Sequence, residues 1–170
     1  DFVKHLIEKA KKIPVGLPWI EKNEIGPIVS KRQFDKIMEY IETGKKEGAK
    51  LVLGGDNPKD PELKNGFFIN PTIFTDVNPN MTIAKEEIFG PVISVLTWES
   101  YEELIEIANS TLYGLTAMIA TNSLSNAMKT AEDIQAGYVW INTFGRYSGA
   151  PYGGWKLSGL GVEECFDEMK

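Results

Sequence analysis

The sequence has one cysteine and one histidine among its 170 residues, and it contains no long apolar run. Cys165 alone cannot form an internal disulfide and is compatible with a reducing cytoplasm. His5 stands near Leu6 and Lys9 on a helical pattern, away from an acid or a second ligand, so no metal site is predicted. A membrane span needs about 18 or more apolar residues, and the first residues lack the order of a signal peptide. We therefore expect no membrane association and a cytoplasmic location.

Positive charge is also scarce. The 18 lysines and arginines are outnumbered by 24 aspartates and glutamates, which gives a net charge of −6. A protein that binds the phosphate backbone normally has a basic face, whereas the lysines here are mixed with glutamates along helical stretches, so nucleic acid is not an expected partner. The hydrophobic content of 42% is ordinary for a globular protein. At this length the chain is expected to form one domain over residues 1–170.

Alternating apolar segments predict an α/β fold. Strand patterns at 92–96, 116–120 and 138–141 alternate with helix patterns at 100–108 and 124–134. Strands of near-continuous hydrophobicity separated by helices predict parallel pairing with right-handed crossovers, as in doubly wound sheets. Upstream, the sequence predicts a helix that Ser30 opens in a capping box with Gln33. It also predicts a helix at 2–12 and short strands at 49–53, 67–69 and 72–74.

The stretch Lys-Glu-Glu-Ile-Phe-Gly-Pro-Val at 85–92 carries more chemistry than the start of a strand needs. Gly90 permits backbone angles that a Cβ would forbid, and Pro91 fixes its own φ. The resulting turn is expected to hold Glu87 and Phe89 in set directions. Without further information, adjacent acids before a strand are most often part of a solvated turn, and this alternative stays open.

A second candidate region follows the third predicted strand. In open α/β sheets, ligands bind beyond the carboxyl ends of the strands, which nominates Asn142 and the loop at 143–155. The loop is rich in glycine and aromatic residues and carries one cation before its final turn, Arg146, whereas a plain connection is usually shorter and more polar. The alternative is a packed surface loop that supports a neighbouring element or a subunit contact.

Several segments, taken in order, carry a resemblance to a known family. They are Gly26-Pro27-Ile28, Gly66-Phe67-Phe68-Ile69-Asn70-Pro71-Thr72, residues 85–92, Asn109 with Tyr113-Gly114-Leu115-Thr116-Ala117, Gly137-Tyr138-Val139-Trp140-Ile141-Asn142, and residues 151–163. Their order and approximate spacing resemble the NAD(P)-dependent aldehyde dehydrogenase family over nearly the whole chain. The resemblance implies an α/β fold with a Rossmann-like parallel sheet and flanking helices, as part of that family's catalytic domain.

The resemblance also implies roles for particular residues. Glu87 would bind the ribose beside nicotinamide in NAD or NADP, and Phe89 would pack near it. Asn142, Phe144 and Tyr152 would lie on the side of the aldehyde substrate. Tyr152 stands where many family members have phenylalanine, which places a hydroxyl group near the substrate.

The nucleophilic cysteine of the family, its general-base glutamate and its dinucleotide-binding domain correspond to no part of these 170 residues, and neither does its closing β-strand. The chain is therefore expected to be a truncated catalytic domain with no catalytic residue, inactive alone. Its parent would oxidise an aldehyde to a carboxylic acid with NAD(P)+ through a thiohemiacetal on cysteine, as a homo-oligomer, either a dimer or a tetramer. The alternative is a non-catalytic module for subunit association.

Two other chemical interpretations fail on the residues themselves. Cys165 is surrounded by acids, which disfavour the thiolate that a nucleophile needs, so it is not expected to be catalytic. The segment Gly-Gly-Trp-Lys-Leu-Ser at 153–158 lacks the spacing of a phosphate-binding loop, in which Gly-Lys-Ser/Thr is contiguous. A nucleoside triphosphate is therefore not an expected ligand.

Overall fold

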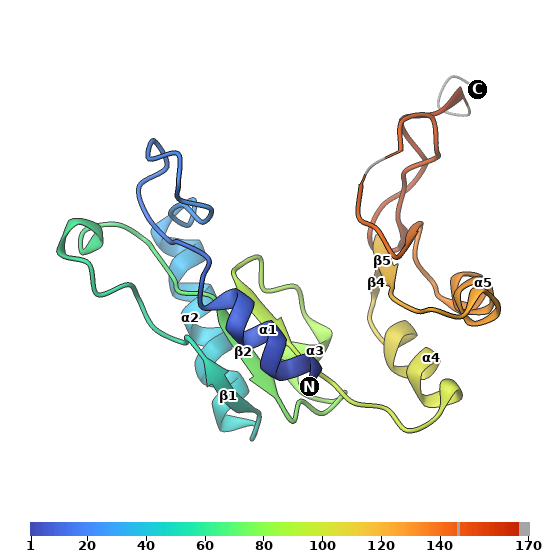
Figure 1. Ribbon diagram of the computed structural model, residues 1–170, viewed down its shortest axis with the longest axis horizontal. Helices are drawn as coiled ribbons and strands as arrows, with labels where there is room; N and C mark the ends of the chain where they lie inside the picture. Colours follow the sequence, from blue (N-terminus) through green and yellow to red (C-terminus); the bar gives the residue numbers. More distant parts are fainter. Residues whose placement is uncertain (146, 167–170) are drawn as a thin grey trace. The chain divides into compact units, whose positions relative to one another are not determined.

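The computed structural model describes residues 1–145 and 147–166, and the chain forms two compact units, Asp1–Thr97 and Trp98–Lys170. Each unit is described by itself (Figure 1). Among the described residues, no helix is long and apolar enough to cross a membrane.

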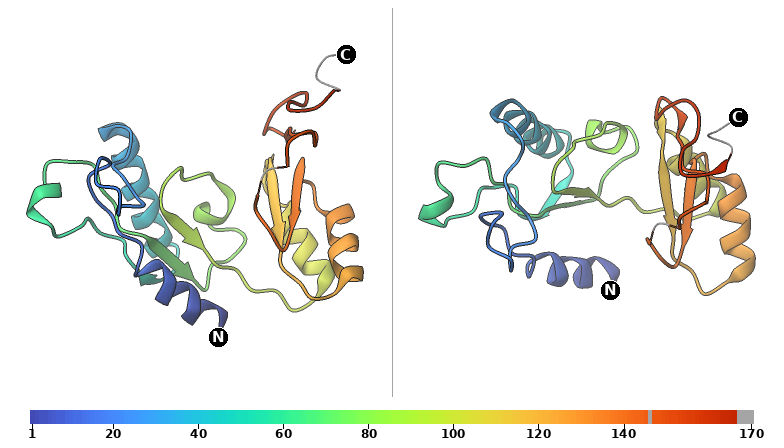
Figure 2. Two further views of the ribbon diagram at one scale, coloured as in Figure 1. Left: turned by 45° about the horizontal axis from the view of Figure 1, so that its top comes forward. Right: turned by 90° about the horizontal axis from the view of Figure 1, so that it is seen from above.

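The first unit contains one mixed three-stranded sheet. Its strand order is β1-β2-β3, with β1 antiparallel to β2 and β2 parallel to β3. Figures 1 and 2 show α2 on one face of this sheet and α1 on the other. The elements are α1 (Phe2–Ala10), α2 (Lys31–Lys46), β1 (Lys50–Leu53), the 3-10 helix η1 (Pro61–Leu63), β2 (Thr72–Thr75), α3 (Thr82–Lys85) and β3 (Val92–Ser94).

Helix α2 organises the core of this unit. Its first turn is capped by Ser30, whose hydroxyl oxygen accepts the N–H of Gln33 at 3.2 Å, as the capping pattern predicts. Along the helix, Ile37 and Ile41 lie on one face and are fully buried against Phe74 of β2. Burying apolar side chains of this size stabilises the fold by about 1.5–3 kcal/mol each. These contacts hold α2 firmly against the sheet.

The second unit is built around a parallel strand pair. β5 and β6 run side by side in register from Thr116 opposite Tyr138 to Ile119 opposite Ile141, and both α4 and α5 lie on one side of the pair (Figure 2). β4 and β7 form a separate, short antiparallel pair. In the chain, β4 precedes β5 and β7 follows β6. The elements are α4 (Tyr101–Asn109), β4 (Tyr113–Gly114), β5 (Thr116–Ile119), α5 (Leu124–Asp133), β6 (Tyr138–Ile141) and β7 (Trp155–Lys156).

The α/β class is confirmed, and the predicted alternation from residue 92 is observed as β3, α4, β5, α5 and β6. The predicted parallel pairing is observed for β5 and β6, which α5 connects, whereas β3 does not pair with β5 and instead pairs with β2 in the first unit. Apolar alternation predicts where strands form but does not identify their neighbours. The predicted strand at 67–69 is also not formed. Phe68 and Ile69 are buried in extended chain, and the carbonyl of Phe67 bonds to the N–H of Ile28 at 2.8 Å.

Candidate functional site

The turn that leads into β3 points its side chains alternately inward and outward. Ile88 is 8% exposed and belongs to the core, so its neighbours Glu87 and Phe89 face solvent, with Phe89 76% exposed. Phe89 has φ +52°, a left-handed conformation that costs a non-glycine residue about 1–3 kcal/mol. Other contacts must therefore hold this turn.

Gly90 serves this turn differently from the prediction. Its φ is not in the left-handed region, which Phe89 occupies instead. A Cβ on Gly90 would lie 2.7 Å from the Cδ1 atom of Ile37, so the glycine allows the chain to lie directly on α2. The close approach, rather than unusual backbone angles, accounts for glycine here.

Gln33 is a residue of this region that the sequence did not reveal. A capping box would direct its side chain back to the N–H of Ser30. Instead, Nε2 donates to the carbonyl oxygens of Ile88 at 3.1 Å and Phe89 at 3.4 Å. These bonds span more than fifty positions of sequence, and no local pattern signals them. Gln33 therefore ties the strained turn to the rigid helix α2.

The two adjacent acids of the turn have different surroundings. Glu86 accepts a hydrogen bond from the Tyr40 hydroxyl at 2.7 Å and is anchored to α2. Glu87 is exposed, and within the described part of the chain no group donates a hydrogen bond to its carboxylate or forms an ion pair with it. Both oxygens of Glu87 are thus open to an external donor, which fits the pair of hydroxyl groups on a ribose. The exposed ring of Phe89 on the same turn fits a flat partner.

Asn142 joins the carboxyl ends of the parallel strands. It follows β6 with φ +56°, a conformation that asparagine adopts more readily than most residues. Its Oδ1 accepts the N–H of Thr121 and its Nδ2 donates to the Thr121 carbonyl, each at 2.9 Å. One donor and one acceptor of the amide are thus committed within the fold. The amide retains a second N–H and a second lone pair for a ligand.

Phe144 and Tyr152 mark the two ends of the loop that follows Asn142. Phe144 is 82% exposed. Tyr152 is half-buried and pairs through its backbone with Glu163, with N–H···O distances of 3.0 and 2.7 Å. The structure therefore brings Glu87 and Phe89 together on one turn of the first unit, and Asn142, Phe144 and Tyr152 into one loop region of the second. Arg146, which the sequence suggested as the loop's cation, lies outside the described residues.

The segment at 153–158 is a structural turn. The Nζ atom of Lys156 donates to the carbonyls of Asn109 at 2.7 Å and Thr111 at 3.0 Å, and Ser158 Oγ accepts the N–H of Gly114 at 2.9 Å. The lysine and the serine that a phosphate loop would need are thus engaged in holding the turn to the end of α4. This agrees with the failed spacing of the motif.

Cys165 is a half-buried free thiol. No thiol besides Cys165 occurs in the sequence. Over residues 1–145 and 147–166, no group of three or more histidine, cysteine, aspartate or glutamate side chains is placed to hold a metal ion.

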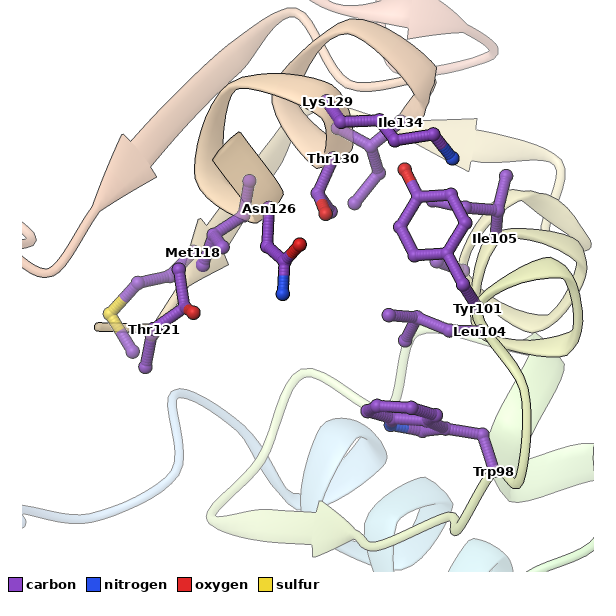
Figure 3. A pocket seen from close by; sticks show the side chains of 13 residues that line it. Trp98, Tyr101, Leu104, Ile105, Met118, Thr121, Asn126, Lys129, Thr130 and Ile134 are labelled. Carbon is purple, nitrogen blue, oxygen red and sulfur yellow. The ribbon is translucent and has the colours of Figure 1, made fainter. Parts of the chain in front are cut away.

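A largely apolar cavity of about 630 Å³ lies in the second unit between α4, β5 and α5 (Figure 3). One wall is tied together by polar contacts. Lys129 Nζ lies 3.3 Å from the ring centroid of Tyr101, and the Tyr101 hydroxyl donates to Asp133 at 2.6 Å. This hydrogen bond, and then Lys129, hold the pKa of Asp133 below its ordinary value. The labelled lining residues are Trp98, Tyr101, Leu104, Ile105, Met118, Thr121, Asn126, Lys129, Thr130 and Ile134.

The chain has an α/β fold with parallel strands and flanking helices, and it matches solved aldehyde dehydrogenase structures with TM-scores of 0.94 and 0.93. A sequence model described as "Aldehyde dehydrogenase family" matches residues 1–170, and the chain belongs to that family.

Named relatives and solved structures agree with this assignment. Retinaldehyde dehydrogenase 3 of Homo sapiens is 52% identical over 164 residues, which is 96% of this chain and 31% of the relative. Betaine aldehyde dehydrogenase of Bacillus subtilis is 45% identical over 96% of this chain and 34% of its own length. The crystal structure of betaine aldehyde dehydrogenase from Staphylococcus aureus in complex with NAD+ has a TM-score of 0.94 and 37% identity, covering 99% of this chain and 34% of that one. The chain thus spans about a third of the length of these proteins.

Proposed function

We propose that the full-length protein that carries this chain oxidises an aldehyde to a carboxylic acid with NAD+ or NADP+. The single observation that carries the proposal is the Glu87 turn. Its carboxylate has no partner among the described residues, while Gln33 and the packing against Ile37 hold the backbone around it. Members of the family include retinaldehyde and betaine aldehyde dehydrogenases, and crystal structures similar to this chain are complexes with NAD+.

In this proposal the first unit serves the cofactor. Glu87 accepts hydrogen bonds from both hydroxyl groups of the ribose beside nicotinamide, and the ring of Phe89 packs near it. The nicotinamide supplies the hydride acceptor when it is bound. A rigid turn is useful here because hydride transfer depends on orientation, and contacts made by a preorganised group do not lose energy to ordering at the moment of reaction.

The second unit serves the aldehyde. Asn142, held by Thr121, presents its remaining amide groups at the strand ends. Phe144 and Tyr152 provide aromatic surface to the substrate, and the Tyr152 hydroxyl adds a polar group. The reaction also needs a thiol nucleophile, and Cys165, which follows the segment at 151–163, does not stand where the family resemblance places that nucleophile. We infer that the nucleophile comes from outside these 170 residues and that the chain alone is inactive, with the domain described here acting as part of a larger catalytic domain.

A second function, subunit association, is favoured by a specific observation. Leu157, Leu160 and Phe166 near the end of the described chain are 68%, 102% and 84% exposed. Exposed apolar side chains that lie close together in the sequence are available to contact another protein surface. We propose that the full-length protein is a homo-oligomer, a dimer or tetramer, and that it works in the cytoplasm.

The test is to replace Glu87 by Gln in the full-length protein, with Glu86→Gln as the matched control. Hydrogen bonds to a charged group contribute about 1.5–3 kcal/mol, so Glu87→Gln should weaken cofactor binding or slow hydride transfer about 10- to 100-fold. Glu86→Gln, whose oxygen already bonds to Tyr40, should have a small effect. Binding is measured by titration with NAD+ and NADP+, and hydride transfer by stopped-flow absorbance of the reduced cofactor. Equal effects of the two substitutions would contradict the assigned role.

A further inference from the structure

Tyr138, the first residue of β6, contacts the loop at 143–155 at two places that lie apart in sequence. Its hydroxyl oxygen accepts the N–H of Tyr147 at 3.2 Å. Its ring lies 5.5 Å from the ring of Tyr152, tilted by 50°. One side chain of a paired strand thus holds both the middle and the end of the loop.

Trp140 reinforces this arrangement from the same face of β6, because side chains two positions apart on a strand point the same way. Its ring lies 5.0 Å from that of Tyr138, tilted by 55°, and its Nε1–H donates to the carbonyl of Gly145 at 3.0 Å. The two aromatic residues of β6 therefore hold the loop at Gly145, Tyr147 and Tyr152. The strand below is itself fixed by its full register with β5.

We propose that Tyr138 is a positioning residue that sets the shape of the aldehyde side of the site and thereby selects among aldehydes. The inference rests on the proposed function. Tyr138 acts through Tyr152 and through the backbone at Tyr147, and it does not need to touch the substrate. A binding surface keeps its geometry only when the residues behind it are locked in place. The ring of Tyr138 supports the ring of Tyr152, and its hydroxyl group fixes the path of the loop.

The two contacts can be separated by substitution in the full-length protein. Tyr138→Phe removes the acceptor for the Tyr147 N–H and keeps both ring contacts. Tyr138→Val also removes the ring, and with it both ring contacts, while keeping a residue that favours strands. Tyr101→Phe is the matched control, since it removes a tyrosine hydroxyl that bonds to Asp133 rather than to this loop.

Two measurements are made on each variant. Hydrogen–deuterium exchange of the peptide that contains Tyr147 reports whether the loop is held. Values of kcat and KM for a series of straight-chain aldehydes of increasing length, with the dissociation constant of NAD+, report selection. Loss of one hydrogen bond should speed exchange in Tyr138→Phe by about three- to tenfold. Its aldehyde KM should rise while kcat and NAD+ binding stay the same, because the interaction serves substrate binding in the ground and transition states alike. Tyr138→Val should also change the order of preference along the series.

Each outcome decides between the interpretations. Faster exchange and a higher aldehyde KM in Tyr138→Phe, an altered order of kcat/KM in Tyr138→Val, and none of these changes in Tyr101→Phe support the proposal. An unchanged order in an active Tyr138→Val enzyme overturns the role in selection, and unchanged exchange in Tyr138→Phe overturns the role in holding the loop. If Tyr138→Val does not fold, Tyr138→Phe still decides through exchange and KM. If the wild-type protein oxidises no aldehyde, the proposed function fails and the role in selection with it, whereas exchange still decides whether Tyr138 holds the loop.

Discussion

Replacing Gln33 by Glu tests whether the turn around Glu87 must be held for the cofactor to bind. The two side chains have the same shape, but a carboxylate cannot donate to the carbonyls of Ile88 and Phe89. Two hydrogen bonds, at 3.1 and 3.4 Å, are therefore lost. Each typical bond contributes about 0.5–1.5 kcal/mol, and the longer one belongs at the low end of that range.

Two further effects of the charge act in opposite directions. A carboxylate in the first turn of α2 interacts favourably with the helix dipole by about 0.3–1 kcal/mol. The same charge faces two carbonyl oxygens, which repel it. The net effect is a loss of about 1–2 kcal/mol in the stability of the turn, which lowers the ratio of formed to unformed turn by about 5- to 30-fold. Because only the formed turn presents Glu87 correctly, the apparent dissociation constant of NAD+ should rise by up to this factor.

The assay is a titration of the full-length variant with NAD+, followed by fluorescence or calorimetry. Gln135→Glu is the control, because it makes the same chemical change and adds the same charge on an exposed residue of the second unit. That control should bind NAD+ as the wild-type protein does. Wild-type affinity in Gln33→Glu would refute the reasoning that this side chain maintains the turn.

Two more substitutions address packing and pH dependence. Gly90→Ala places a Cβ 2.7 Å from the side chain of Ile37 and should destabilise the protein by about 1–3 kcal/mol in urea unfolding. In the control Gly145→Ala, the new Cβ meets no atom closer than 3.9 Å, so the loss of stability should be smaller. Equal losses in the two variants would contradict the packing role of Gly90. The lowered pKa of Asp133, due first to the Tyr101 hydroxyl, adds stability above the ordinary aspartate pKa that is lost as pH falls through the folded-state pKa. Tyr101→Phe should raise the pKa of Asp133 in a carboxyl NMR titration and reduce stability near neutral pH but not in strong acid; an unchanged pKa would contradict the assigned cause.

The features that the sequence predicted well are those set by nearby residues. Ser30 caps its helix because the N–H three positions later is within reach in any helix that starts there, and the observed bond goes to Gln33. The strands β5 and β6 follow from unbroken apolar segments. The nomination of Asn142 came from a general rule about strand ends, and the residue does lie at the ends of the parallel pair.

What the sequence missed depends on contacts between distant segments. The pairing of β3 with β2 is one example, since an apolar strand can pair with any exposed edge. The side chain of Gln33 is another example. A glutamine at this position can bond either to the N–H of Ser30 in a capping box or to the distant carbonyls of Ile88 and Phe89, and the sequence does not distinguish these two bonds. The Tyr138 contacts belong to the same class. The apolar pattern of β6 predicted a strand. The contacts of its aromatic side chains depend on the path of the loop at 143–155, and the sequence of that loop has no periodic pattern from which its path could be predicted.

Backbone strain is a feature that the proposed cofactor turn and the proposed substrate loop have in common. Among the described residues, five non-glycine positions have positive φ, and Phe89, Asn142 and Lys156 are three of them. Each of the three is held by hydrogen bonds that involve a side chain: Gln33 bonds to the turn at Phe89, the amide of Asn142 bonds to Thr121, and the ammonium of Lys156 bonds to the end of α4. Strain of about 1–3 kcal/mol per residue persists only where the surroundings enforce it. In the proposed cofactor turn and at the start of the proposed substrate loop, a strained backbone position thus lies at or beside a proposed functional side chain, and side-chain hydrogen bonds hold that position. Removing such a contact should therefore affect binding before it affects global folding.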